Sequence, residues 1–479
     1  MDKPFIKLFH TPNNGYFLDV NKNELVRVSG SSYEFLSSIM SGKNGSEDTI
    51  PQELIELKSC GYLTTESNVK EVRHPYSAFA KDFLERKVNK ITLQVTQSCN
   101  MRCRYCIYDE TANPRQRKHS NKRMSWDIAK CAIDFLWDHS VDSPKVNVGF
   151  YGGEPLLEFS MIKKVVEYSE KRFYGKPLSF SITTNGTMLD DEKVRYMQRH
   201  NIGLLVSLDG PKEINDRNRV FKDGRGTYDI VMENIERLRV VSPDYASKLQ
   251  ISMVIDPEND FDCINSIFLN DAEMKSLSLI SSTIDYDYDD KKDTVSSDYV
   301  WKSEYQRFLG ILSYYGRISR DSVSPIVTNA LTEAINNYSS MKDSYMLNPV
   351  DAPSGPCIPG QMRLFVNALG KLYPCERVSE TSSAMCIGSL FDGFDLLNVD
   401  KLLNVGRMTG DHCRKCWCFR HCVLCAKKAV NDSGILSAER KLTYCKSVME
   451  NVIKKIKLHL LLMEVPVYYG QQARGTARK

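Results

Sequence analysis

The sequence predicts an α/β fold built on parallel strands and followed by a cysteine-rich region. From Lys90 onward, strand-like apolar runs alternate with helical runs, and repeated βα units of this kind form a parallel sheet or a barrel. The strand-like runs are ITLQVT, KVNVGFY, LSFSITT, GLLVSL and QISMVI. After Pro353 this periodicity weakens and cysteine, glycine and proline dominate. We expect a region without a large core there, held together by metal.

The composition is that of an ordinary globular protein with two or three domains. The chain has 479 residues, of which 42% are hydrophobic and 26% charged, and its net charge is +4. This balance excludes a nucleic-acid-coating surface and a basic membrane anchor. The N-terminus lacks the apolar stretch of a signal peptide, and Leu458–Met463 is too short to span a bilayer. We therefore expect a cytoplasmic protein that binds neither nucleic acid nor membrane.

The 15 cysteines are clustered rather than scattered. Three lie within Cys99–Cys106 and eight more lie between Cys357 and Cys425. In a reducing compartment such clusters bind metal more often than they form disulfides. Cys60, Cys131 and Cys263 lie outside the clusters, and we expect them to be buried packing residues.

The first cluster has the spacing Cys99-x3-Cys103-x2-Cys106 and follows the strand ITLQVT. Three thiolates so spaced can hold three irons of a [4Fe–4S] cluster and leave the fourth iron open. Structural zinc is the alternative, but it requires four closed ligands and no fourth follows nearby.

The run CNMRCRYC, with Tyr105 before the last cysteine, resembles the signature of the radical S-adenosylmethionine (radical SAM) superfamily. YGGEP, ITTNGT and VSLDGP follow at strand ends and resemble the family's SAM-contacting segments in the same order. The resemblance implies a partial (β/α)6 TIM-like barrel in which the open iron binds SAM. Cleavage of SAM then releases a 5′-deoxyadenosyl radical that abstracts a substrate hydrogen. The implied cofactor contacts are Tyr105, Gly152, Gly153 and Glu154 (SAM amino group), Asn185 (ribose), and Ser207 and Arg219 (carboxylate).

The second cysteine group contains Cys413-x2-Cys416-x5-Cys422-x2-Cys425 and resembles the SPASM extension of radical SAM enzymes, although the usual last spacing is three residues. The resemblance implies two auxiliary [4Fe–4S] clusters, and therefore three clusters in all. One would take Cys413, Cys416, Cys422 and Cys445. The other would take Cys357, Cys375 and Cys425, with Cys386 or no protein residue as its fourth ligand. A pair of zinc ribbons is the alternative for this region.

Glu376 directly follows Cys375. Sulfatase maturases of the SPASM group carry an aspartate base at the matching place. Glu376 is therefore a candidate catalytic base, and its difference from aspartate weakens the sulfatase-maturase interpretation.

The N-terminal residues predict short strands, two helices and a further strand after Gly61, a winged-helix-like pattern. This pattern resembles the recognition element of peptide-maturing enzymes, which binds a leader peptide as an added strand. The expected domains are 1–75 (leader recognition), 89–300 (radical SAM barrel), 301–349 (bridging helices), 350–450 (SPASM) and 451–479 (C-terminal helix and tail).

Together these features resemble an enzyme that forms cysteine thioether crosslinks in a ribosomally made, Cys-rich precursor peptide, of the sactipeptide or ranthipeptide group. We expect flavodoxin or ferredoxin as its electron donor. Other peptide modifications remain alternatives, namely carbon–carbon crosslinking, epimerisation and formylglycine-type oxidation. A zinc-stabilised binding protein without catalysis is the alternative of another class.

Overall fold

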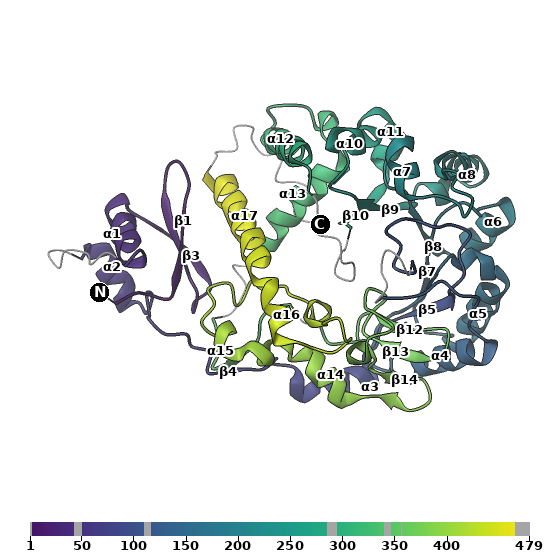
Figure 1. The fold of residues 1–479 in the computed structure, drawn as a ribbon, viewed down its shortest axis with the longest axis horizontal. Coiled ribbons are helices and arrows are strands. Elements are labelled where there is room, and N and C mark those ends of the chain that lie inside the picture. The colour runs from purple at the N-terminus through teal and green to yellow at the C-terminus, as the bar shows by residue number, and fades with distance from the viewer. Residues whose placement is uncertain are drawn as a thin grey trace.

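The computed structural model describes residues 2–42, 50–109, 116–284, 295–339, 346–355 and 357–464. Its centre is a sheet whose first six strands are parallel and follow one another in chain order (Figure 1). These strands are β5 (Lys90–Thr96), β6 (Val146–Gly152), β7 (Leu178–Thr184), β8 (Ile202–Ser207), β9 (Gln250–Ile255) and β10 (Ser278–Thr283). The expected (β/α)6 arrangement is confirmed.

Helices follow the strands and cover the outer face of the sheet (Figure 1). They are α4 (Trp126–Asp138), α5 (Phe159–Arg172), α6 (Asp191–Arg199), α7 (Lys212–Asn218), α8 (Tyr228–Val241), α9 (Pro243–Ala246), α10 (Phe261–Asn270) and α11 (Ala272–Ser276). In β5, Ile91, Leu93 and Val95 are fully buried in the main core. Because side chains alternate along a strand, the residues between them face the lumen of the partial barrel.

The cysteine-rich region extends this sheet. β12 (Leu364–Val366) pairs with β5 in parallel, and β13 (Lys371–Tyr373), β14 (Gly388–Ser389) and β15 (Gly393–Phe394) continue it antiparallel. The expectation of a region without a large core is wrong here. All three β12 side chains are fully buried in the main core, because β12 is an inner strand covered on both faces.

The N-terminal module is a three-stranded antiparallel sheet with two helices. Its elements are β1 (Ile6–His10), β2 (Gly15–Asp19), β3 (Glu24–Val28), α1 (Gly30–Met40) and α2 (Gln52–Ser59). The strand expected after Gly61 is not formed. Leu63 has a φ of 59°, which turns the chain out of the extended conformation. The segment's one described backbone hydrogen bond to the sheet side runs from the amide of Phe5 to the carbonyl of Thr64, at 2.7 Å.

Two bridging helices lead from the barrel to the C-terminal region, namely α12 (Ser297–Tyr314) and α13 (Pro325–Ser339). β4 (Glu71–Val72) pairs with β11 (Val350–Asp351), and α3 (Ala80–Arg86) precedes the barrel. The remaining helices are α14 (Leu396–Leu403), α15 (Gly410–Cys413), α16 (Ala438–Thr443) and α17 (Cys445–Glu464). The C-terminal helix thus begins six residues before the expected boundary at 451, and the tail from 465 to 479 lies outside the described residues.

Helix α17 packs against the N-terminal module (Figure 1). Val452, Ile456 and Leu460 of α17 share a small core with Phe9 and Leu18 of the module. At the end of the helix, one carboxylate oxygen of Glu464 accepts hydrogen bonds from three side chains of the β1–β2 hairpin. These are Thr11 at 2.7 Å, Asn14 at 2.7 Å and Tyr16 at 2.6 Å.

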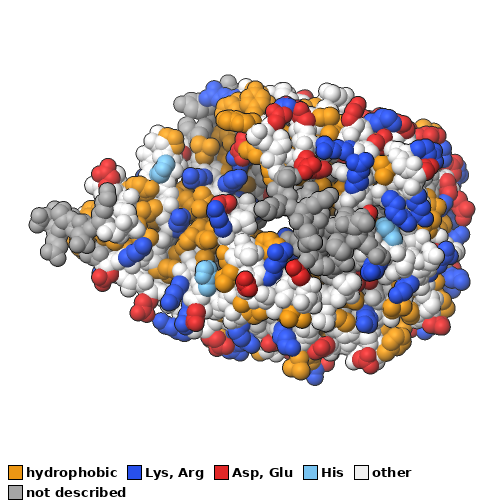
Figure 2. Space-filling model, in the orientation of Figure 1, with side chains coloured by type: hydrophobic (Ala, Val, Ile, Leu, Met, Phe, Trp, Pro, Cys, Tyr) orange, Lys and Arg blue, Asp and Glu red, His pale blue; other side chains and the backbone are white. Residues whose placement is uncertain are grey.

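Acidic and basic side chains are interspersed on the face shown in Figure 2. This agrees with the small net charge. Within the described ranges, no helix combines the length and the apolar character needed to cross a membrane.

Candidate functional site

The three cysteines of the first cluster lie together in the loop after β5. Burial raises the pKa of all three thiols to about 12. Charge repulsion within the trio adds to this, since each pair of thiols interacts. Such buried thiols are neutral until a metal ion takes the place of their protons. This donor set fits three irons of a cubane cluster.

Backbone hydrogen bonds hold this loop in place. The amide of Arg102 donates to the carbonyl of Val220 at 2.8 Å, and that of Arg104 donates to Asn218 at 3.0 Å. On the other side, the amide of Gly153 donates to Thr96 at 2.9 Å. These backbone hydrogen bonds tie the cysteine loop to the segment after α7 and the end of β6 to the end of β5.

The two glycines of YGGEP are required by close approach. A β-carbon on Gly152 would lie 2.2 Å from the carbonyl oxygen of Thr96. One on Gly153 would lie 2.2 Å from that of Ser98. Both distances are shorter than any real contact, so only glycine lets the end of β6 lie against the cysteine loop.

Glu154 and Asn185 tie the ends of β6 and β7 to this loop. The Glu154 carboxylate is completely buried and accepts from the amide of Leu156 (2.9 Å), the hydroxyl of Thr184 (2.7 Å) and the amide of Asn185 (2.8 Å). The side-chain amide of Asn185 lies 3.9 Å from Cys99 Sγ. The structure thus brings these two expected SAM contacts onto the Cys99 side of the loop.

Arg219 forms a buried ion pair with Asp209, which lies in the VSLDGP segment but was not among the expected SAM contacts. Arg219 Nε lies 2.9 Å from Asp209 Oδ2, and both side chains are at most 9% exposed. The Tyr105 hydroxyl donates to the same carboxylate oxygen. The guanidinium also lies over the Tyr105 ring, 5.5 Å from its centroid. The Arg219 side chain is thus occupied by its contacts with Asp209 and Tyr105. Ser207, the other expected carboxylate contact, is partly buried at the end of β8.

A buried polar network in the lumen was not predicted. Arg117 Nε lies 2.7 Å from the Glu380 carboxylate, and another Arg117 nitrogen donates to the carbonyl of Glu376 at 2.7 Å. Gln94 donates to both Glu380 and the Tyr108 hydroxyl. No local pattern could have revealed this network, because Arg117 and Glu380 are far apart in the chain. It joins the cysteine loop to the C-terminal region.

The thiols of Cys357, Cys375 and Cys425 form a second group. Cys357 and Cys425 are exposed as whole residues, but desolvation of the Cys357 thiol by neighbouring atoms, with repulsion from Cys425 and Cys375, raises its pKa to about 11. The Cys386 thiol donates to the carbonyl of Gly388 at 3.5 Å and interacts with Tyr373. Its place as a fourth ligand stays a prediction.

A third group contains Cys413, Cys416, Cys422 and Cys445. Burial, with repulsion from the other three thiols, raises the pKa of Cys416 to about 11. The ammonium of Lys441 is buried beside this group, 3.4 Å from Cys413 Sγ and 2.6 Å from the Thr409 hydroxyl. Because a buried ammonium requires negative charge nearby, this arrangement fits thiolate ligands.

Glu376, the expected base, lies between Cys375 and two arginines. One carboxylate oxygen pairs with Arg363, and the other is buried without a hydrogen-bond partner in the described part of the chain. A buried carboxylate oxygen without a partner is unusual and marks Glu376 as a residue whose surroundings are incomplete in the described part of the chain.

Three cysteines lie outside the thiol groups and the sequence motifs, namely Cys60, Cys131 and Cys263. Cys60 is exposed, so the expectation that it is buried is wrong; its helix α2 ends at the surface. Cys131 and Cys263 are partly buried against the main core. Across the described ranges, no group of three or more His, Cys, Asp or Glu side chains is arranged to hold a single metal ion.

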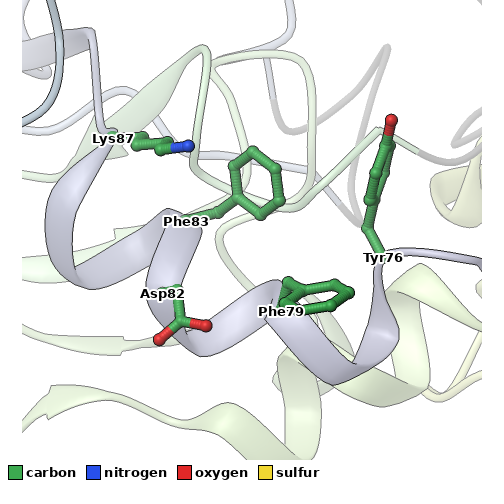
Figure 3. A pocket seen from close by; sticks show the side chains of 5 residues that line it. All are labelled: Tyr76, Phe79, Asp82, Phe83 and Lys87. Carbon is green, nitrogen blue, oxygen red and sulfur yellow. The ribbon is translucent and has the colours of Figure 1, made fainter.

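A pocket of about 330 Å³ lies on α3, away from the thiols. The rings of Tyr76, Phe79 and Phe83 line it together with Asp82 and Lys87 (Figure 3). It contains no cysteine, and we assign no chemistry to it.

Residues 93–269 match the family model of the radical SAM superfamily. This part of the chain is a radical SAM domain. A serine-type anaerobic sulfatase-maturating enzyme of Bacteroides thetaiotaomicron is 34% identical over 142 residues, which are 29% of this chain and 34% of that protein. A cysteine-type anaerobic sulfatase-maturating enzyme of Clostridium perfringens is 24% identical over 368 residues, 74% of this chain and 92% of that protein.

The solved structure of native anSMEcpe with bound AdoMet has the same fold. It aligns with a TM-score of 0.58 at 19% identity and covers 78% of this chain and 100% of that one. The first curated relatives are matched over 34% to 43% of their own length.

Proposed function

We propose that this chain is a radical SAM peptide maturase that installs cysteine thioether crosslinks in a ribosomally made precursor peptide. The observation that carries the proposal is the trio of thiols in the loop after β5, beside the Gly152–Glu154 turn; Cys99 is buried, and Cys103 and Cys106 are half-buried. A [4Fe–4S] cluster held by Cys99, Cys103 and Cys106 supplies reductive cleavage of SAM to a 5′-deoxyadenosyl radical.

The surrounding residues receive SAM in this proposal. The Gly152–Glu154 turn accepts the amino group, Asn185 lies toward the ribose, and Ser207 lies toward the carboxylate. Arg219 is paired with Asp209 and therefore acts by positioning the turn at Tyr105 rather than by binding the carboxylate. Flavodoxin or ferredoxin supplies the electron.

The thioether step is supported by the second group of thiols. Cys357, Cys375 and Cys425 would hold an auxiliary iron–sulfur cluster, which would supply a site for the substrate thiolate and an acceptor for the electron left over when the carbon–sulfur bond forms. Glu376 would accept the proton of the thiol, and the hydrogen atom removed from the substrate carbon would leave with the 5′-deoxyadenosyl group. Cys413, Cys416, Cys422 and Cys445 would hold the second auxiliary cluster.

The N-terminal module recruits the leader of the precursor in this proposal. β3 pairs only with β2 within the described sheet, so its other edge is open to an added strand.

A formylglycine-type oxidation is the second candidate, favoured by two sulfatase-maturating relatives and by the carboxylate of Glu376 next to Cys375. It converts a single cysteine or serine and forms no crosslink.

Reaction with a Cys-rich peptide tests the proposal, and a short reading frame beside the gene is the place to look for the natural one. The anaerobically reconstituted enzyme is incubated with SAM, a reductant and the peptide, and the product is analysed by mass spectrometry before and after thiol alkylation. We expect the loss of two hydrogens per crosslink and one cysteine protected from alkylation. A lighter product whose cysteines all alkylate would exclude a thioether. Loss of the sulfur from a cysteine would indicate formylglycine, and a colourless protein containing zinc would exclude radical chemistry.

Recruitment is tested by Val26→Pro and Arg27→Pro in β3. Successive residues of a strand point their amides to opposite sides, so one of the two removes an outward amide. That variant is expected to bind a fluorescent leader peptide at least about tenfold more weakly. Unchanged affinity in both variants would refute recruitment at this edge.

A further inference from the structure

Arg117 has the largest of the fully buried side chains in the described part of the chain. Its guanidinium lies over three aromatic rings, 4.6 Å from the centroid of Phe365, 5.4 Å from that of Tyr108 and 5.9 Å from that of Tyr151. These rings belong to β12, to the segment just after Cys106 and to the end of β6. Arg117 therefore lies where the first thiol site and the cysteine-rich region meet.

Arg117 contacts the main chain of residues 376–380, which directly follow Cys375. One guanidinium nitrogen donates to the carbonyl of Glu376 at 2.7 Å and to the carbonyl of Val378 at 3.3 Å. The planar guanidinium presents several donors in a fixed geometry. A single buried side chain thus holds the segment that carries the expected base.

The carboxylate of Glu380 is the counter-ion of this arginine. Arg117 Nε lies 2.7 Å from it, and both side chains are at most 8% exposed. Gln94 of β5 donates to the same carboxylate oxygen at 2.5 Å and to the Tyr108 hydroxyl at 2.9 Å. The amide of Glu380 also donates to the carbonyl of Gln116 at 3.0 Å. Because a buried charge requires such partners, this pair fixes the segment against β5 and the cysteine loop.

A second arginine contacts the same segment from the other side. Arg363 pairs with the Glu376 carboxylate, but the Arg363 side chain is 44% exposed. Ion pairs that face solvent contribute little to holding a structure in place. The position of residues 376–380 therefore depends mainly on Arg117 and Glu380.

We propose that Arg117, paired with Glu380, is a positioning residue that fixes Cys375 and Glu376 relative to the cysteine loop after β5. The inference rests on the proposed function and adds a residue that acts through these two. A carbon radical formed at the first site has to meet the substrate thiol held near Cys375, and small changes in such a geometry lower rates strongly. Without the pair, SAM is cleaved but few cleavage events end in product.

A double variant and a matched control test this inference. Arg117→Met combined with Glu380→Gln removes both members of the buried pair, so it leaves no unpaired charge and is expected to fold. Arg172→Met is the control. Arg172 also lies over an aromatic ring, 4.8 Å from the centroid of Trp137, and pairs with a carboxylate, Asp134 at 3.0 Å, but it does so between the outer helices α4 and α5.

Two quantities are measured on the reconstituted enzyme. The first is the amount of modified peptide formed per 5′-deoxyadenosine. We expect this ratio to fall at least about tenfold in the double variant and to keep its wild-type value in Arg172→Met. The second is deuterium uptake by residues 376–380 without peptide. We expect it to be at least about tenfold faster in the double variant, because the hydrogen bond from Glu380 to Gln116 opens when the segment is released.

Each outcome decides for or against the inference. A wild-type ratio in the double variant would overturn it, as would an equal fall in Arg172→Met. Complete loss of SAM cleavage in the double variant would also overturn it, since Arg117 would then serve the first site itself. Unchanged deuterium uptake by residues 376–380 would overturn it in every case.

Failure of the proposed function is distinguishable from these outcomes. The ratio counts whichever modified peptide the wild type forms, so a product other than a thioether refutes the proposed function and leaves the test of Arg117 intact. If the wild type modifies no peptide, deuterium uptake alone decides whether the pair positions residues 376–380.

Discussion

The loop of Cys99, Cys103 and Cys106 and the region from Cys357 to Cys445 both bring thiols together, but by different means. In the first, three cysteines within eight residues are fixed by backbone hydrogen bonds to neighbouring segments. In the second, Cys357, Cys375 and Cys445 join thiols of the run Cys413–Cys425 from other segments of the chain. The first group is therefore local in the chain, whereas the other two form only where separate segments meet.

Each region has one buried cation, and the two cations differ in their partners. Arg219 beside the first loop is neutralised by the carboxylate of Asp209. Lys441 beside the third thiol group contacts only Cys413 and Thr409 among the described residues. An ion pair between Arg219 and Asp209 thus lies beside the first site. Beside the third thiol group, the positive charge of Lys441 has no carboxylate partner among the described residues.

Cysteine substitutions give the largest expected contrast. Cys103→Ala should abolish SAM cleavage and leave the auxiliary iron in place, because only this loop leaves an iron open. Cys422→Ala should retain SAM cleavage but lose coupled product. 5′-Deoxyadenosine and iron content are measured for both variants, and near-normal cleavage by Cys103→Ala would reject the assignment.

Arg219→Met should have the next largest effect, a loss in the free energy of unfolding. It leaves Asp209 as an unpaired buried charge, which costs about 3–5 kcal/mol in the free energy of unfolding. Arg225→Met is the control, since its pair with Asp223 is exposed to solvent and should change the free energy of unfolding little. Denaturant unfolding of both variants checks the difference. Equal losses would show that the Arg219 pair does not hold the loop.

Gly153→Ala should displace the cysteine loop without removing a ligand. Its β-carbon would collide with the carbonyl of Ser98, and such a displacement lowers the rate of SAM cleavage about 100-fold. Gly30→Ala meets no atom within 4 Å and should have no effect. Steady-state assays of 5′-deoxyadenosine decide, and normal activity in Gly153→Ala would mean that the contact with Ser98 does not place the loop.

Lys441→Met tests the uncompensated charge of the second region. Removing a positive charge next to Cys413 favours the oxidised cluster, and the reduction potential of one auxiliary cluster should fall by roughly 100 mV. Lys441→Arg should change it little. Potentiometric titration followed by electron paramagnetic resonance measures the shift, and identical potentials in all three proteins would contradict the prediction.

Glu464→Gln should have the smallest effect. Burial opposes ionisation of Glu464, but hydrogen bonds from Tyr16, Thr11 and Asn14 lower its pKa below 4.5. A depressed pKa stabilises the fold above pH 4.5, and this contribution is lost as the pH falls through the folded value. We expect a loss of about 1 kcal/mol at neutral pH, smaller in acid. Unfolding of the iron-free chain at pH 7 and pH 4 tests this; a pH-independent difference would exclude the ionised carboxylate as its source.

Local periodicity and spacing predicted five of the six parallel strands and the cysteine loop, but not β10 (Ser278–Thr283), most of whose side chains are exposed. The sixfold barrel and the role of Gly152 and Gly153 came from the family resemblance. The sequence could not place β12 in the barrel sheet, since a three-residue strand carries almost no pattern. It also missed the pairing of Arg117 with Glu380 and the burial of Lys441. Both are contacts between segments that meet only after folding. The segment after Gly61 was wrongly predicted as a strand because the left-handed conformation of Leu63 has no sequence signal.

Helix α17 limits how this protein can be re-engineered. It runs from Cys445 to Glu464, and its 20 residues give it a length of about 30 Å. At its end, the Glu464 carboxylate accepts hydrogen bonds from the β1–β2 hairpin. Its apolar side chains are shared with β1 and β2. A chimera that exchanges residues 1–75 for the module of another protein would leave those side chains without a partner surface. A chimera should therefore exchange the residues of α17 that contact the module together with the module itself.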